Sequence, residues 1–184
     1  MKEFYSQLEK ELKIKFGEDI KVWVWGEISD VKGFYGTGKV GNSVVIWITE
    51  RPSSARFTLR AHSFPDKVDE WFYGMLKEES LENIHLTDFV KIMADSGIYP
   101  TQEELKINAE WMKKEIENLM EDKKKLIIIA NTRRVVNRMK ENLPNYQIIY
   151  KPFFKHIFRF NSKEKRDNLL REILRDVKIM ADNK

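Results

Sequence analysis

The sequence predicts an α+β protein with an N-terminal five-stranded OB-type β-barrel, a small α/β segment after it and a C-terminal helix. Two observations on the order of elements support this fold class. Three strand-like segments precede a helical segment over 65–84 and two more follow it, which is the connectivity of an OB barrel. A strand–helix–strand pattern over 125–150 then predicts a parallel βαβ unit.

Periodicity defines the elements of the predicted barrel. A helix is expected over 2–16, where apolar residues recur at helical spacing, and Gly17 is expected to end it. The strands are expected where apolar residues alternate with polar ones or form short runs. They cover 21–32, 44–49, 55–62, 88–94 and 104–111. A loop with four glycines over 33–41 joins the first two strands.

The chain divides into three predicted parts. The N-terminal helix and the barrel occupy 1–111, a connector helix occupies 112–122, and a basic α/β segment occupies 123–184. In the last part the expected elements are a buried strand over 125–130, a helix over 133–142, a strand over 146–150 and a helix over 163–180.

Charge is distributed unevenly along the chain. Residues 123–184 carry 17 Lys and Arg against 6 Asp and Glu, whereas residues 1–122 carry 16 against 23. The C-terminal part is therefore net +11 and the rest net −7. This asymmetry predicts that the C-terminal part faces a polyanion. The alternative is an uneven Lys- and Glu-rich surface of the kind found in thermophiles.

Composition argues against several classes of protein. The chain has no cysteine, which excludes disulfides and thiolate metal sites and fits a cytoplasmic location. No run approaches the ~20 apolar residues of a membrane span, and residues 1–16 lack the apolar core of a signal peptide. His62, His85 and His156 show no metal-ligand spacing, so neither a metal nor a cofactor is predicted.

The predicted barrel offers a binding face for single-stranded nucleic acid. OB barrels bind such ligands on strands two and three and on the neighbouring loops, through stacked aromatic rings and cations. Side-chain alternation places the rings and cations of these strands outward. The candidate contacts are Trp25, Lys32, Phe34, Tyr35, Lys39, Trp47, Arg56 and Arg60. For the tryptophans the alternative is packing against a neighbouring element.

The C-terminal part adds a second group of candidates. Arg133, Arg134 and Arg138 lie at the start and along one side of a predicted helix, where backbone amides and guanidinium groups favour phosphate. Lys151, Lys155 and Arg159 then alternate with phenylalanines, a pattern that suits single strands. The alternative is that these phenylalanines belong to the core and that the cations are only solvated.

The segment Val22-Trp-Val-Trp-Gly-Glu-Ile-Ser-Asp30 resembles the opening strand of the exodeoxyribonuclease VII large subunit. Residues 45–50, 88–93, 105–109 and 126–152 follow the order of that family's later elements. The resemblance implies an OB domain that binds single-stranded nucleic acid. The family's Gly-Ala-Ala motif is replaced here by residues 133–138, so no catalytic residue is carried over.

Together these observations predict a non-catalytic binder of single-stranded DNA or RNA. Two alternatives stay open: a minimal exodeoxyribonuclease of the exonuclease VII type, and an OB-type module that binds other proteins. A small protein partner or self-association is compatible with each, and no membrane partner is expected.

Overall fold

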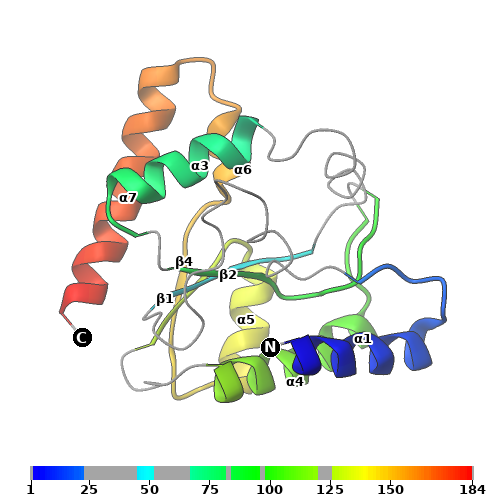
Figure 1. Cartoon of the computed structure of the whole chain (residues 1–184). Helices are drawn as coiled ribbons and strands as arrows, with labels where there is room; N and C mark the ends of the chain where they lie inside the picture. Colours follow the sequence, from blue (N-terminus) through cyan, green and yellow to red (C-terminus); the bar gives the residue numbers. More distant parts are fainter. Residues whose placement is uncertain are drawn as a thin grey trace.

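A computed structural model describes residues 2–22, 45–51, 67–81, 84–95, 98–119 and 126–183. They form an α/β architecture with one parallel sheet between layers of helices (Figure 1). The strands are β1 (Val45–Thr49), β2 (His85–Asp88), β3 (Ile127–Ala130) and β4 (Gln147–Tyr150). The helices are α1 (Lys2–Phe16), α3 (Lys67–Glu78), α4 (Gln102–Leu119), α5 (Arg133–Asn142), α6 (Phe154–Phe158) and α7 (Lys163–Asp182).

The prediction of a five-stranded OB barrel is wrong. β1 pairs in parallel with β2 and with β3, and β3 pairs in parallel with β4, whereas OB barrels belong to the antiparallel architectures. The expected strand over 104–111 lies inside α4. The expected strand over 88–94 is replaced by β2, which ends at Asp88. Of the expected strand over 21–32, only the first two residues are described, and the expected strand over 55–62 lies outside the described residues.

The C-terminal strand–helix–strand unit is confirmed. β3 and β4 are parallel neighbours, and α5 connects them over the predicted residues. Thr132 caps α5, because its side chain accepts a hydrogen bond from the Val135 amide. The N-terminal helix also has its predicted bounds, and it ends at Gly17, whose φ of +104° disfavours other residues.

The core has two layers because alternate residues of each strand face opposite sides of the sheet. Val45 and Trp47 pack with residues of α3, α6 and α7, whereas Ile46 and Ile48 pack with α1, α4 and α5. All five residues of β1 are buried, as expected for a strand covered on both faces. β1, from the predicted barrel region, therefore shares one sheet with β3 from the basic C-terminal part.

The strand order is β2-β1-β3-β4. The chain adds β2 on one side of β1, and it then adds β3 and β4 on the other side, so the direction of winding reverses between β1 and β3. The chain passes from β1 to β2 by way of α3 on one face of the sheet, and it passes toward β3 and β4 by way of α4 and α5 on the other. Right-handed crossovers require this change of face when the direction of winding reverses. The fold therefore has a topological switch point, and in open α/β sheets ligands bind beside the carboxyl ends of the strands at such a point.

Candidate functional site

The candidate site lies at the carboxyl edge of the sheet, where the segments that follow β1 and β3 lead away from the sheet. Glu50 follows β1, and the segment from Asn131 to Arg134 follows β3 and opens α5. The Arg134 Nη1 atom lies 3.6 Å from Glu50 Oε1, so an ion pair bridges the switch point. The Arg134 guanidinium also lies over the ring of Tyr99, 4.5 Å from its centroid. Tyr99 comes from the segment that leads into α4, so three parts of the chain meet here.

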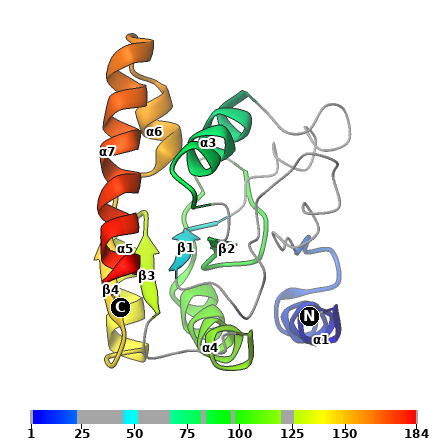
Figure 2. The same cartoon turned by 60° about the vertical axis from the view of Figure 1, so that its left-hand side comes forward.

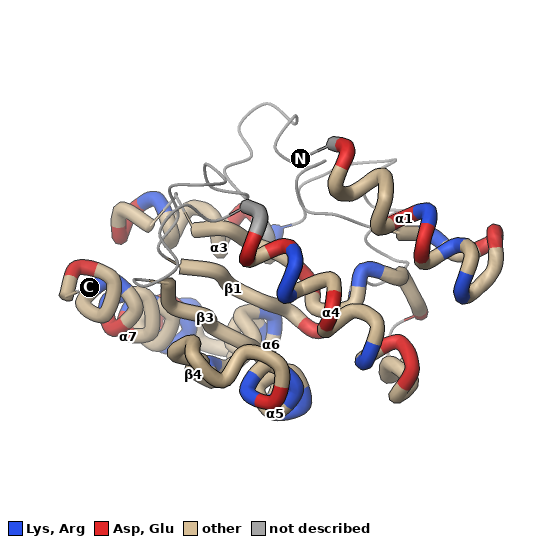
Figure 3. Tube along the Cα trace, turned by 90° about the horizontal axis from the view of Figure 1, so that it is seen from below, with Lys and Arg blue, Asp and Glu red and all other residues tan. Residues whose placement is uncertain are grey.

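The first turn of α5 concentrates positive charge at the end of a helix that is itself electropositive. Arg133 and Arg134 are its first two residues, and its first turn contains no acidic residue. Cations at a helix N-terminus are unfavourable by about 0.3–1 kcal/mol each, whereas an anion bound there interacts favourably with both the helix end and the cations. Arg133 is exposed, and among the described residues it has no ion-pair partner. In Figure 3, the charged residues of α5 are mostly Lys and Arg, whereas α1 and α4 carry many charges of both signs.

Asn131 fixes the geometry of this edge. Its backbone amide donates to the Ile48 carbonyl at 3.1 Å. Its side-chain carbonyl accepts from Trp47 Nε1 at 2.8 Å, and its amide nitrogen donates to the Lys151 carbonyl at 3.0 Å. One buried side chain thus ties the ends of β1, β3 and β4 together, which holds the first turn of α5 in a defined position.

The cations and phenylalanines after β4, which were predicted to contact nucleic acid together, lie partly at the surface and partly in the core. Lys151 pairs with Asp176 of α7 at 3.0 Å, Lys155 is half-buried, and Arg159 is exposed. Phe154 is buried and stacks on Phe72 with the two ring centroids 4.0 Å apart, so the core interpretation holds for this phenylalanine. Figure 2 shows α6 beside the first half of α7.

The other predicted contacts can be assigned as follows. Trp47 was expected to face outward, and this expectation is wrong: the residue is fully buried and its ring packs edge-on against Phe72. Its strand is covered on both faces, so no position in it projects into solvent. Arg138 pairs with Glu141 at 3.0 Å and donates to Gln102. Seven candidates lie outside the described residues: Trp25, Lys32, Phe34, Tyr35, Lys39, Arg56 and Arg60.

A second cluster of ionisable groups is buried between β2, α1 and α4. The Glu115 carboxylate accepts hydrogen bonds from Tyr5 at 2.7 Å and from Thr87 at 3.0 Å, and it contacts His85 Nε2 at 3.1 Å. Lys91 Nζ lies 2.9 Å from the second carboxylate oxygen. Lys91 and Glu115 are 1% and 2% exposed. The Lys91–Glu115 ion pair at the centre of this Glu115 cluster is buried, so the arrangement indicates a structural role.

The Glu115 cluster makes stability depend on pH. Burial by itself raises the pKa of Glu115, but the ammonium of Lys91 and the contact with His85 outweigh it and hold the pKa well below the usual 4.5. A depressed pKa means that Glu115 stabilises the fold at pH values above its unfolded pKa, and that this contribution declines as the pH falls below about 4.5.

We therefore expect the free energy of unfolding to fall as the pH is lowered from 5 to 3, and to fall less steeply in Glu115→Gln. Urea unfolding at several pH values measures both slopes. Equal slopes in the two proteins would show that Glu115 titrates normally.

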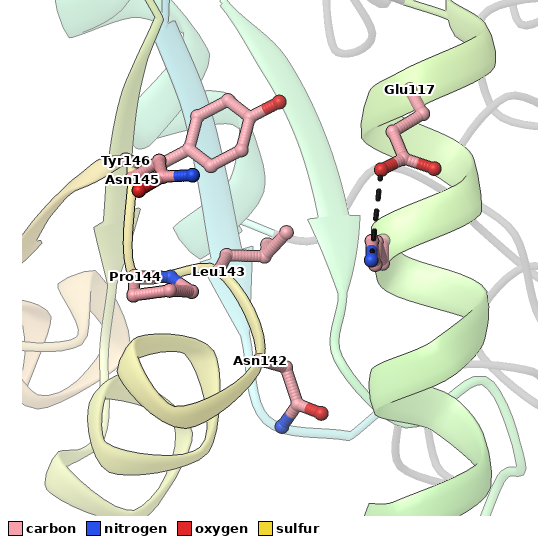
Figure 4. Close-up of a pocket in the computed structure, with 7 residues that line it drawn as sticks. Glu117, Asn142, Leu143, Pro144, Asn145 and Tyr146 are labelled. Atoms are coloured by element: carbon pink, nitrogen blue, oxygen red, sulfur yellow. Dashed lines mark ion pairs between the residues drawn. The ribbon is translucent and has the colours of Figure 1, made fainter.

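A pocket of about 470 Å³ lies between α4 and the turn from α5 to β4 (Figure 4). Its lining residues are Lys113, Glu117, Asn142, Leu143, Pro144, Asn145 and Tyr146. Its two charged residues, one turn apart on α4, pair with each other at 3.9 Å. Burial and the neighbouring Glu117 raise the pKa of Tyr146 above its usual value. The pocket adjoins the start of β4, at the end of the sheet opposite the switch point.

Comparison with known protein families and curated proteins does not identify a function. No protein-family model matches the chain, and no curated protein shows a significant match to it. Within the described ranges, no group of three or more His, Cys, Asp or Glu side chains is arranged to hold a metal ion. In the same part of the chain, no helix combines the length and apolar composition needed to cross a membrane.

Sequence reasoning missed Tyr99 at this edge. Tyr99 is 67% exposed although its side chain is large and partly apolar. The sequence does contain a pattern that could have located it. In Tyr99-Pro-Thr-Gln-Glu-Glu104, Thr101 is followed three residues later by Glu104, which predicts the start of a helix. A helix that starts at residue 102 brings Tyr99 to the carboxyl edge, because the connection from β2 to α4 lies there.

Proposed function

We propose that this protein binds single-stranded nucleic acid along the carboxyl edge of its parallel sheet. The observation that carries the proposal is the pair Arg133 and Arg134 in the first turn of α5, beside the exposed ring of Tyr99. Cations for phosphates and an exposed ring for a base are the two elements that single-strand binding combines. The resemblance to exonuclease VII stays a prediction, and the proposal covers both DNA and RNA.

The local charges favour an anionic ligand despite one carboxylate. Glu50 offsets part of the charge of Arg134, at 3.6 Å. Arg133 and the amides at the start of α5 add positive potential without a described counterion. Arg159, the residue that follows α6, is a further exposed cation without an ion pair to any described residue. A chain of phosphates meets such separated cations better than a single small anion does.

Arg133→Gln should weaken binding of a ~20-nucleotide single strand and reduce its salt dependence. Each phosphate contact contributes about 0.7 to the slope of log affinity against log salt for single strands. We expect the slope to fall by about 0.7 in Arg133→Gln and by about 1.4 when Arg159→Gln is added. Fluorescence anisotropy at several salt concentrations measures it, with the matching duplex as comparison.

Lys140→Gln is the matched control, because it removes one exposed charge from the last turn of the same helix. Its affinity and slope should equal those of the unchanged protein. Equal losses in Lys140→Gln and Arg133→Gln would mean that only overall charge matters and would contradict the proposed location. A strand that shortens on a gel during the measurement would favour the exodeoxyribonuclease alternative.

A further inference from the structure

Tyr99 differs from the other aromatic residues that contact a cation. Four cation–ring contacts join described residues, and their rings belong to Trp71, Tyr99, Trp111 and Phe158. Of these four aromatic residues, only Tyr99 is exposed, at 67%. Because the Arg134 guanidinium lies over one face of this ring and most of the side chain is accessible, the other face is open to a ligand.

The backbone that carries Tyr99 is held rigidly. Pro100 is buried, and Thr101 begins a reciprocal capping box, in which its hydroxyl accepts from the Glu104 amide at 3.2 Å and its amide donates to the Glu104 carboxylate at 2.7 Å. Arg51 pairs with the same carboxylate and donates to the Ile92 carbonyl at 3.0 Å. An exposed ring on a fixed support loses little conformational freedom when it binds, which is a property of binding positions.

We propose that Tyr99 is a stacking platform for one unpaired base, with Arg134 on the opposite face of the ring. This inference rests on the proposed function and names the group that selects single strands. A base in a duplex is covered on both faces by its neighbours, whereas a base in a single strand can present a face to a ring. Arg134 adds a cation to the ring that meets the base, and Arg133, next to it in the chain, supplies a contact for the adjoining phosphate.

The test compares two strands that share phosphates but differ in bases. One is a fluorescent ~20-nucleotide oligothymidine, and the other has the same length and abasic sugars throughout its central part. Tyr99→Ala should weaken oligothymidine binding roughly 5- to 150-fold, the range that loss of one stacked base produces. Tyr99→Phe, which retains the ring, should bind within about twofold of the unchanged protein, since stacking needs no hydroxyl. Binding of the abasic strand should be the same in all three proteins.

The control variant is Ile179→Ala, which shortens another exposed apolar side chain, near the end of α7. It should bind both strands as the unchanged protein does. Unchanged oligothymidine binding in Tyr99→Ala, together with weaker binding in Arg133→Gln, would overturn the stacking role and leave the proposed function standing. Equal loss for both strands in Tyr99→Ala would also overturn it, because Tyr99 would then act only by positioning Arg134. If the unchanged protein binds neither strand at low salt, both proposals are wrong.

Discussion

Replacing Glu115 by glutamine should lower the free energy of unfolding by about 3–5 kcal/mol, because it leaves a buried ammonium without its anion. Lys91 is 1% exposed and lies 2.9 Å from the carboxylate. The hydroxyls of Tyr5 and Thr87 also donate to Glu115, and a glutamine amide would bring two further donors into this group. Since domains of this size are stable by only about 5–15 kcal/mol, the change should move the urea midpoint strongly.

A double-mutant cycle separates the ion pair from general damage to the core. Lys91→Met alone should also be strongly destabilising, since it leaves the buried carboxylate uncompensated. The double variant should be more stable than the sum of the two single losses predicts, by about 1–3 kcal/mol. Losses that add without any coupling would show that the two groups do not interact in the folded protein. As a control, the circular dichroism spectrum of each variant should show the helix content of the unchanged protein. The m-value of its urea unfolding curve should also be unchanged.

The Glu115 cluster also explains why β2 was not predicted at its observed position. Its sequence, His85-Leu-Thr-Asp88, has three polar residues, which is typical of a turn or loop, yet all four residues of the strand are buried. His85 and Thr87 both contact Glu115 of α4, which lies 30 and 28 residues further along the chain, respectively. Local hydropathy cannot detect a polar strand whose burial depends on a distant carboxylate.

The first part of α4 was misassigned for a different reason, whereas the helix expected over 112–122 matches its second part as far as Leu119. Residues 104–111 show a short alternation that is typical of a strand, but this window is too short to reveal the longer period. Leu105, Ala109, Met112 and Ile116 are all buried, and their spacing is that of one helix face. A wider window and the Thr101–Glu104 capping box both indicate the helix, so this part of the fold was accessible from the sequence.

The continuous apolar runs in β1 and β3 were the clearest evidence for a parallel sheet. Val45-Ile-Trp-Ile48 and Ile127-Ile-Ile-Ala130 have no polar face, which is typical of strands covered by helices on both sides. Assigning alternation to the first run placed Trp47 on the surface and contributed to the barrel interpretation. The arginines of α5 were identified correctly as residues at a helix start, whereas their contact with Tyr99 depends on tertiary structure.

Trp47→Ala should lower the free energy of unfolding by about 3–5 kcal/mol, because it removes a fully buried indole from the centre of the sheet. It also leaves the Asn131 side-chain carbonyl without its donor, which lies at 2.8 Å. Trp47→Phe retains most of the packing against Phe72, so its loss should be smaller, about 1–3 kcal/mol, and should come mainly from the unpaired Asn131 oxygen. Urea unfolding followed by circular dichroism measures both.

The same two variants distinguish a core role for Trp47 from a binding role. Trp47→Phe, measured at a temperature at which it is fully folded, should bind oligothymidine as tightly as the unchanged protein, because a buried ring offers no face to a base. The opposite pattern, normal stability with weakened binding, would place Trp47 on a ligand-binding surface and contradict the sheet. Binding should survive in Trp47→Phe because two other Asn131 hydrogen bonds, to the Ile48 and Lys151 carbonyls, still join the ends of β1, β3 and β4 ahead of the first turn of α5 in this variant.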